Sequence, residues 1–297
     1  MRSFEELIKA AQDKGPKKVV VAAAHDGEVI QALKSAQELG LVEGILVGDS
    51  SLIYQEAQKW GLELKEKQVI HETDPEVIAS RAVELVRLGE GDMLMKGLID
   101  TAKLMKAVLD KDRGLRTGRA LSHVAVLQVE GIDRFIFITD SGINIAPDLA
   151  RKAEIIQNAI EVAQALGVKE PKVAVLTAIE VVNPEMPATV EAANLAKMAE
   201  RGQIKGAIVD GPLALDLAIS PEAAKHKKVN SPVAGKADIL VVPYIEVGNV
   251  LLKALIHFAR AKAAGVVMGA KAPIVLMSRS DAHETKTYSL ALGLMVA

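Results

Sequence analysis

Cysteine is absent from this chain of 297 residues, which excludes disulfides, thiolate metal sites and cysteine nucleophiles. Aromatic residues make up only 3% of the sequence, so few side chains could stack on bases or sugars. The formal net charge of -2 gives no bulk attraction to nucleic acid or to an anionic membrane. The chain also lacks a run of 18 uncharged apolar residues, and its first fifteen residues form a charged amphipathic pattern rather than a signal peptide. We therefore expect a soluble cytoplasmic protein.

Short apolar runs alternate with helical patterns closed by glycine along most of the sequence. This alternation is typical of parallel βαβ units. Residues 122–129 and 134–140 interrupt it as two apolar strands joined by a short turn, which predicts an antiparallel hairpin. A chain of this length that is 50% hydrophobic can fill two ordinary cores. The sequence predicts an α/β protein of two domains with mainly parallel sheets, residues 1–140 with 271–297 and residues 141–270.

The stretch PIVLMSRSD, residues 273–281, joins an apolar run to four polar residues. The run predicts a strand buried on both faces, and ligands of open α/β sheets bind where such strands end. Arg279 has the planar, bidentate geometry that suits phosphate, Ser278 offers a hydroxyl, and Asp281 is a potential base. The alternative is a solvated turn in which Asp281 only caps the following helix.

Four other predicted strands end in glycine and polar residues. Turn and cap chemistry explains each one alone, but their recurrence at successive strand ends predicts a ligand site. Where a helix begins next to such a strand end, free backbone N–H groups and the helix dipole favour an anion. The candidate substrate-binding residues are Lys96, Gly97 and Thr101; Asp140, followed by Ser141; Asp210, Gly211, Pro212 and Asp216; and Gly248 with Asn249.

Taken together, these motifs resemble the phosphate acetyltransferase and phosphate butyryltransferase family. DTAKL, ITDSGIN, DGPLALD, PYIEVGN and SRSD occur in that order, and the ending SRSDAHETKTYSLAL is more similar to the butyryltransferases. The resemblance implies two α/β domains of the isocitrate/isopropylmalate dehydrogenase-like architecture with a cleft between them. It also implies reversible transfer of a butyryl group between coenzyme A and inorganic phosphate, with coenzyme A as a substrate and with no metal or permanently bound cofactor.

The same resemblance implies roles for the SRSD residues. Arg279 would neutralise the phosphate, and Ser278 would donate a hydrogen bond to the sulfur or the developing oxyanion. The acetyltransferase pattern has an aspartate seven positions after this serine, where the present chain has Thr285. Asp281, as first choice, or Glu284 would then act as the base that removes the thiol proton.

Three other functions compete with this interpretation. Acetyl transfer differs from butyryl transfer only in pocket volume, and each methylene contributes about 1 to 3 kcal/mol of preference. A metal- and NAD-dependent dehydrogenase of related architecture would need a G-x-G-x-x-G fingerprint and metal carboxylates, which the sequence lacks. A non-catalytic acyl-CoA sensor would bind without turnover. Whichever applies, apolar residues on more than one face of segment 249–265 predict a homo-oligomer.

Overall fold

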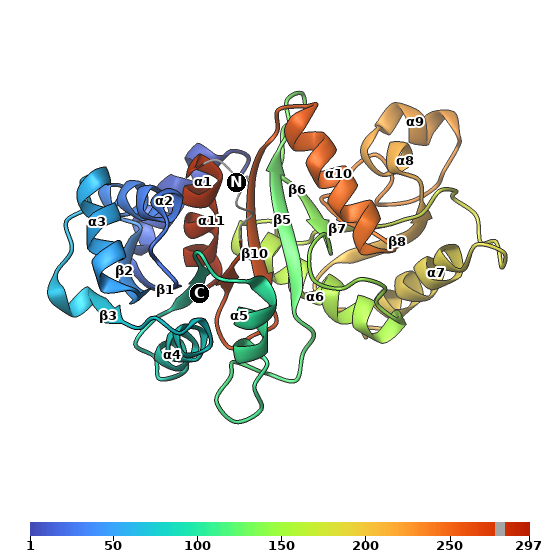
Figure 1. The fold of residues 1–297 in the computed structure, drawn as a ribbon. Coiled ribbons are helices and arrows are strands. Elements are labelled where there is room, and N and C mark those ends of the chain that lie inside the picture. The colour runs from blue at the N-terminus through green and yellow to red at the C-terminus, as the bar shows by residue number, and fades with distance from the viewer. Residues whose placement is uncertain (277–282) are drawn as a thin grey trace. The chain divides into compact units, whose positions relative to one another are not determined.

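The structure is a computed structural model that describes residues 1–276 and 283–297. The chain forms two compact units (Figure 1), which we call unit 1, Met1–Ser3 with Ala120–Ala263, and unit 2, Phe4–Arg119 with Ala264–Ala297. The C-terminal segment thus belongs to the same unit as most of the N-terminal part of the chain. The divisions fall near 120 and 264, whereas the sequence pattern predicts 140 and 271.

The difference at the first boundary comes from strand pairing. Strand β5 (Ser122–Gln128) pairs antiparallel with β6 (Ile136–Thr139), as the hairpin prediction required. Strand β6 then pairs in parallel with β9 (Ile239–Val241), which lies a hundred residues further along the chain. These long-range hydrogen bonds attach residues 120–140 to unit 1.

Unit 2 carries the strand order β3-β2-β1-β4-β11-β10. Every neighbouring pair is parallel except β10 with β11. The carboxyl ends of β1, β2, β3, β4 and β11 therefore lie at one edge of the sheet. The elements of this unit are α1 (Phe4–Lys14), β1 (Lys17–Ala22), α2 (Gly27–Glu38), β2 (Val42–Gly48), α3 (Ser50–Trp60), η1 (Glu66–Gln68), β3 (Val69–His71), α4 (Pro75–Arg87), β4 (Met93–Lys96), α5 (Thr101–Val108), β10 (Lys262–Met268), β11 (Ile274–Val275) and α11 (His283–Val296).

An aspartate begins each of the helices α2 to α5. The side chains of Asp26, Asp49, Asp74 and Asp100 accept hydrogen bonds from backbone N–H groups in the first turn of the helix that follows. Such caps satisfy N–H groups that have no partner within the helix, and each one is worth about 1 kcal/mol. The sequence therefore encodes where these four helices start, at the carboxyl ends of the preceding strands.

Unit 1 carries the strand order β5-β6-β9-β7-β8, in which β6, β9, β7 and β8 run parallel. The register places Ile138, Leu240, Ala174 and Asp210 in one row across these four strands. Their carboxyl ends consequently share an edge. The remaining elements are α6 (Leu149–Ala165), β7 (Lys172–Leu176), α7 (Pro187–Glu200), β8 (Ile208–Leu213), α8 (Leu215–Ile219), α9 (Pro221–His226) and α10 (Ile245–His257).

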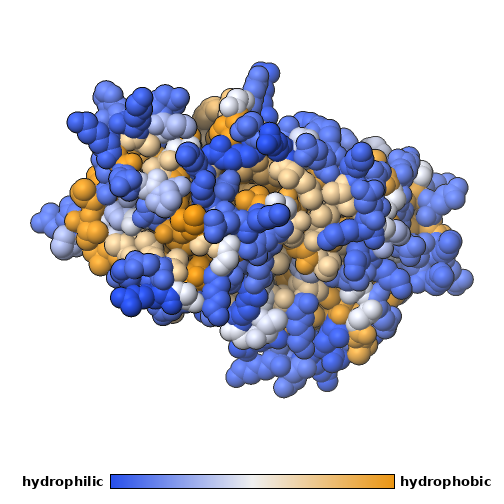
Figure 2. All heavy atoms as spheres, turned by 180° about the vertical axis from the view of Figure 1, so that it is seen from behind, coloured by the Kyte–Doolittle hydropathy of each residue, from blue (hydrophilic) through white to orange (hydrophobic). Residues whose placement is uncertain are grey.

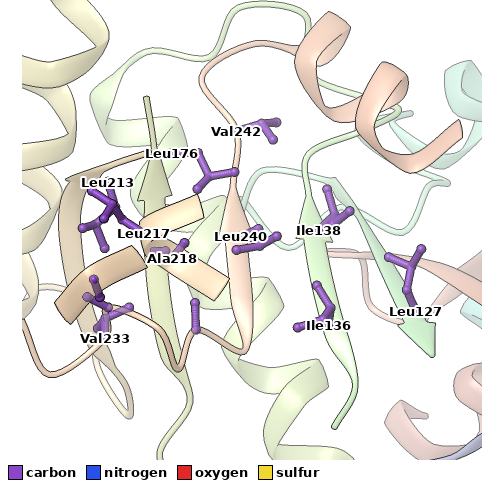
Figure 3. Close-up of a cluster of buried hydrophobic side chains, with 14 of the residues drawn as sticks. Leu127, Ile136, Ile138, Leu176, Leu213, Leu217, Ala218, Val233, Leu240 and Val242 are labelled. Carbon is purple, nitrogen blue, oxygen red and sulfur yellow. The ribbon is translucent and has the colours of Figure 1, made fainter. Parts of the chain in front are cut away.

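One face of the unit 1 sheet packs against α8, α9 and α10 through a single apolar cluster (Figure 3). Ile138, Leu240 and Leu176 from the sheet meet Leu217 of α8 and Val233 of the following loop. Each side chain of this size that leaves water contributes roughly 1.5 to 3 kcal/mol. This cluster holds the strand ends of unit 1 in a fixed arrangement.

Hydrophilic side chains cover most of the face shown in Figure 2, with smaller hydrophobic patches between them. Within residues 1–276 and 283–297, every helix is too short or too polar to cross a membrane.

Candidate functional site

Asp140 directly follows β6, and its buried carboxylate organises the turn after the strand. It accepts hydrogen bonds from the backbone N–H groups of Gly142 at 2.8 Å, Ile143 at 3.0 Å and Asn144 at 3.2 Å. The Asn144 side chain adds a fourth bond of 2.6 Å and also donates to the carbonyl of Leu121. Asp140 thus fixes the backbone at this strand end.

Gly248 packs against that same turn. A Cβ atom at this position would lie 2.7 Å from the carbonyl oxygen of Asp140 and 3.0 Å from Cα of Ser141. Only glycine therefore allows α10 to approach the end of β6 this closely. The helix begins at Ile245, so Gly248 is its fourth residue and Asn249 its fifth. Gly248 is buried and Asn249 is exposed.

Asp210 and Gly211 lie within β8, which continues to Leu213. The Asp210 carboxylate accepts a hydrogen bond of 2.8 Å from the N–H of Gly211. A Cβ on Gly211 would lie 2.9 Å from Cβ and O of Val175 and 3.2 Å from Cβ of Ala192. The missing side chain at Gly211 thus serves the close packing of β8 on β7 and α7.

Pro212 and Asp216 follow Asp210 along the chain but have different surroundings. Pro212 is buried and is joined to the preceding glycine by a cis peptide bond. Asp216 is exposed in α8, and its Oδ2 lies 4.0 Å from Nζ of Lys227, which also lies 3.5 Å from Oε2 of Glu180. Exposed ion pairs of this kind contribute at most about 1 kcal/mol. Asp216 is therefore part of a surface charge group.

In unit 2, Lys96 ends β4 and is only 9% exposed. Its Nζ donates to the carbonyl of Gly97 at 3.3 Å. The N–H of Gly97 donates to the carbonyl of Ala22 at 2.8 Å, and a Cβ at position 97 would lie 2.2 Å from the carbonyl oxygen of Ala23. The ends of β4 and β1 are therefore in direct backbone contact, with a buried ammonium group beside them.

Thr101 is exposed at the first position of α5. The sequence predicts free backbone N–H groups at this helix start. The structure shows that Asp100 Oδ1 already accepts hydrogen bonds from Ala102 at 2.8 Å and Lys103 at 3.4 Å. Capping by the helix's own aspartate removes the two donors on which an anion would otherwise have relied.

Strand β11 pairs in parallel with β4, and Val275 lies opposite Met95. The SRSD stretch thus follows a strand adjacent to the one that Lys96 ends. Ser278, Arg279 and Asp281 lie outside the described residues.

Glu284 is exposed in the first turn of α11 and accepts a hydrogen bond of 2.6 Å from the hydroxyl of Tyr288. It lines a depression of about 390 Å³ together with Ser35 and Leu39, near the carboxyl-terminal end of α2. The carboxyl end of β1, in contrast, leads into the amino-terminal end of that helix. Glu284 therefore lies beside α1 and the carboxyl-terminal part of α2.

The structure also reveals polar groups that sequence reasoning missed. His123 is one of them: its Nδ1 is hydrogen-bonded at 2.9 Å to Oγ of Ser141, which the sequence had singled out with Asp140. Two lysines, Lys152 and Lys286, are each 3% exposed. Lys286 donates to Oε2 of Glu28, in the first turn of α2, at 3.2 Å. Helical periodicity offered a signal for Lys152, because it lies three and four positions before two buried isoleucines of α6.

Among the carboxylates that the structure describes, Asp238 has a raised pKa, but it lies at the edge of the unit 1 sheet opposite the strand ends. Burial raises the pKa of Asp238, which precedes β9, above the usual range for aspartate. The N–H of Lys172 donates to its Oδ2 at 2.9 Å, and Nε of Arg134 lies 3.6 Å from its Oδ1. Both contacts lower the pKa, but the effect of burial is larger. Asp238 therefore joins strands and does not belong to the candidate site.

Among residues 1–276 and 283–297, no group of three or more histidine, aspartate or glutamate side chains is arranged to hold a metal ion. Each unit has a glycine in close backbone contact at its strand ends: in unit 1 Gly248 lies against the turn that Asp140 orders, and in unit 2 Gly97 lies beside the buried Lys96. Such an arrangement can bind and orient an anionic substrate at strand ends.

Comparison with known proteins gives consistent matches over the whole chain. The model of a family described as phosphate acetyl/butaryl transferase matches residues 74–294. Phosphate butyryltransferase from Clostridium acetobutylicum is 48% identical over 297 residues, covering 100% of this chain and 99% of that protein. Phosphate acetyltransferase from Thermotoga maritima is also 48% identical and covers 99% of both chains.

Solved structures agree with these relatives. A branched-chain phosphotransacylase from Enterococcus faecalis superposes with a TM-score of 0.83 at 38% identity, covering 94% of this chain and 98% of the other. A 4-hydroxythreonine-4-phosphate dehydrogenase from Klebsiella pneumoniae gives a TM-score of 0.57 at 15% identity, covering 95% of this chain and 99% of the other. The second likeness is one of fold alone, and it confirms the predicted dehydrogenase-like α/β architecture.

Proposed function

Because the chain belongs to the phosphate acetyltransferase and phosphate butyryltransferase family, we propose that it transfers a short-chain acyl group reversibly between coenzyme A and inorganic phosphate. The preferred acyl group is butyryl, and the reaction is butyryl-CoA plus phosphate giving butyryl phosphate plus coenzyme A. Matches at 48% identity over nearly the full length to acyltransferases favour this activity over a dehydrogenase of related fold.

In the direction that forms the thioester, a base removes the proton from the coenzyme A thiol. The thiolate attacks the acyl phosphate carbonyl, a C–S bond forms, and a tetrahedral oxyanion results. Its collapse breaks the C–O bond to phosphate, which leaves with the electron pair. No covalent acyl-enzyme is needed, since a ternary complex supplies proximity and orientation.

The SRSD residues supply the charges for this reaction. Arg279 neutralises the phosphate in a bidentate contact, and Ser278 donates a hydrogen bond to the sulfur or the oxyanion. Asp281 is the base that removes the thiol proton. Asp281 is the first choice over Glu284 because it is closer in sequence to the end of β11, and the Glu284 carboxylate already accepts a hydrogen bond from Tyr288.

The observation that carries the proposal is the shared edge of parallel strand ends within each unit. In unit 1 this edge brings Asp140 and Gly248 into contact, and in unit 2 it places the buried Lys96 beside β11. Ligands of parallel sheets bind at such edges. The substrate-binding residues of the proposal are Lys96, Gly97, Thr101, Asp140, Asp210, Gly211, Pro212, Asp216, Gly248 and Asn249.

The direct test mixes the purified protein with phosphate and a series of acyl-CoA thioesters of increasing chain length and follows release of free thiol. We expect turnover that is highest with butyryl-CoA. A maximum at acetyl-CoA would instead assign the protein as a phosphate acetyltransferase. Binding of acyl-CoA without thiol release from any thioester would favour the non-catalytic sensor and contradict the proposal.

The proposal includes a cytoplasmic location and a homo-oligomeric state. Coenzyme A and phosphate are the small-molecule partners, and we propose no nucleic acid or membrane partner. Helix α10 supports association with a second copy of this chain, because Gly248 is its one buried residue. Val247 is 43% exposed, Val250 67%, and Phe258, just past the helix, 90%. Apolar surfaces of this kind commonly mark subunit interfaces.

A further inference from the structure

A buried lysine lies where three helices of unit 1 begin. Lys152 is the fourth residue of α6, and its side chain is 3% exposed. Helices α6, α7 and α10 follow β6, β7 and β9 along the chain. Because these three strands are parallel neighbours, the helices start at the same edge of the sheet, where the candidate site lies.

The ammonium group of Lys152 contacts the other two helix starts directly. Its Nζ is hydrogen-bonded to Oε2 of Glu191, in the second turn of α7. It also lies 5.4 Å from the ring centroid of Tyr244, the residue immediately before α10. That distance is within the range of a cation–π interaction. One side chain thus joins α6, α7 and α10.

A charge at this position has an energetic cost that an apolar residue would avoid. Desolvating an ammonium group is unfavourable, and the amino-terminal end of its own helix also disfavours a positive charge. Ile155 and Ile156, one turn further along α6, are fully buried apolar residues. A buried ion pair is therefore weak support for stability alone, and a role in fixing geometry accounts better for Lys152.

Residues next to Lys152 and Tyr244 connect to both sides of the contact between Asp140 and Gly248. Gly248 lies one helical turn after Tyr244, and its N–H donates to the carbonyl of Tyr244 at 3.4 Å. On the other side of that contact, Nη1 of Arg151 donates to Oδ1 of Asn144 at 3.4 Å, and Asn144 is bound to Asp140. Adjacent residues of α6 therefore hold the β6 turn and the start of α10.

We propose that Lys152 is a positioning residue for acyl transfer, which aligns the first turn of α10 with the turn after β6 through Glu191 and Tyr244. The inference rests on the proposed function, in which Gly248 and Asn249 contact the substrate. Lys152 itself does not touch the reacting atoms. Its loss weakens binding of the ground state and the transition state alike, so KM rises more than kcat falls.

The test measures steady-state kinetics with butyryl-CoA and phosphate for Lys152→Met and Lys152→Arg. We expect Lys152→Met to raise KM for butyryl-CoA about tenfold or more while kcat stays within about threefold of the parent. Lys152→Arg keeps the charge and should restore most of the loss. The matched control is Lys197→Met, which removes an exposed Lys197–Glu200 ion pair from α7 and should leave both constants unchanged.

A double variant tests whether Lys152 acts through its ion pair with Glu191. Because Glu191 acts through Lys152, Lys152→Met with Glu191→Leu should raise KM no further than Lys152→Met does. If Lys152→Met fails to fold, Glu191→Gln carries the test, since that side chain is 32% exposed and should raise KM in the same direction.

Two results would overturn the inference, and they differ in what they imply. If the parent is active and both Lys152→Met and Glu191→Gln keep its KM while the melting temperature falls, Lys152 is only structural and the proposed function stands. If the parent releases no thiol from any acyl-CoA, the proposed function fails and the positioning role fails with it.

Discussion

At the scale of single residues, the strand ends of both units depend on glycines, which have no side chain, as much as on polar side chains. Gly97, Gly211 and Gly248 each lie where a Cβ would come within 3 Å of neighbouring atoms. Protein interiors tolerate such overlap poorly, because surrounding atoms are already close-packed. Gly97 lets the ends of β4 and β1 approach each other, and Gly248 lets the start of α10 approach the turn after β6, whereas Gly211 lets β8 pack on β7 and α7.

Gly248→Ala tests this directly. Alanine favours a helix over glycine by about 1 kcal/mol, but the clash with Asp140 and Ser141 backbone atoms should cost about 1 to 3 kcal/mol. We expect a net loss of stability in thermal unfolding and a fall in kcat/KM. Val250→Ala in the same helix, at a residue 67% exposed, is the control and should leave activity unchanged. Full activity in Gly248→Ala would show that the close contact of Gly248 with Asp140 and Ser141 is not needed for activity.

Arg279→Ala tests the proposed phosphate contact. Loss of a charged transition-state contact should lower kcat by about 10² to 10³-fold. Arg279→Lys should recover only part of the activity, because lysine cannot make the bidentate contact. Arg87→Ala, at the end of α4, serves as a control for removing one positive charge. Parent-like turnover by Arg279→Ala would exclude Arg279 from the mechanism.

At the scale of secondary-structure elements, unit 1 aligns its parallel strands through Asp238 at the edge opposite the candidate site. The backbone of Asp238 donates to the carbonyl of Lys172 at 2.8 Å and accepts from the N–H of Phe137 at 2.8 Å. Its carboxylate binds the N–H of Lys172 as well. The residue thereby joins the beginnings of β7, β9 and β6.

The raised pKa of Asp238 predicts a pH-dependent effect on stability. The folded state binds the proton of Asp238 more tightly than the unfolded state does, so protonation of Asp238 stabilises the fold. This contribution to the free energy of unfolding is fully present below the unfolded pKa of about 3.9 and is lost as the pH rises through the folded pKa. Relative to the parent, Asp238→Asn should therefore become more stable with rising pH over a window that opens near pH 4. Urea unfolding across that window measures the difference.

The control for this measurement is Asp133→Asn, whose side chain is 84% exposed. Its stability relative to the parent should stay nearly constant across the same pH range. The measured quantity is the free energy of unfolding of Asp238→Asn minus that of the parent. If this difference stays constant or falls as the pH rises, Asp238 does not have a raised pKa.

At the scale of the whole molecule, the exposed apolar face of α10 predicts self-association. Leu251, Leu252 and Leu255 of this helix pack partly against the core of unit 1, whereas Val250 and Phe258 face solvent. Covering these exposed side chains removes apolar area from water at about 25 cal/mol per Å². The covering surface of the proposal is a second copy of the same chain.

Light scattering checks this prediction. The parent should have the mass of two or more chains. The double variant Val250→Glu with Phe258→Asp should lower the mass towards that of one chain, because burying the new carboxylates is unfavourable. Val181→Glu, an exposed apolar residue outside α10, should keep the parent mass. A monomeric parent at micromolar concentration would refute association through α10.

Local patterns in the sequence were sufficient for much of the fold. Apolar runs and caps such as Asp74 followed by Pro75 mark their strands and helices, because β-strand burial and helix capping depend on neighbouring residues. The hairpin of β5 and β6 was predicted for the same reason. The order of motifs ending in SRSD was likewise enough to indicate the family, which the comparisons confirm.

Tertiary structure alone decided which distant residues meet. Residues 120–140 belong to unit 1 because β6 pairs with β9. Local sequence patterns do not encode a pairing partner that lies a hundred residues away. The same applies to the contact of Gly248 with Asp140 and to the burial of Lys152 against Glu191 and Tyr244. Spacing along a chain determines the face on which a side chain lies, but only packing determines what that face touches.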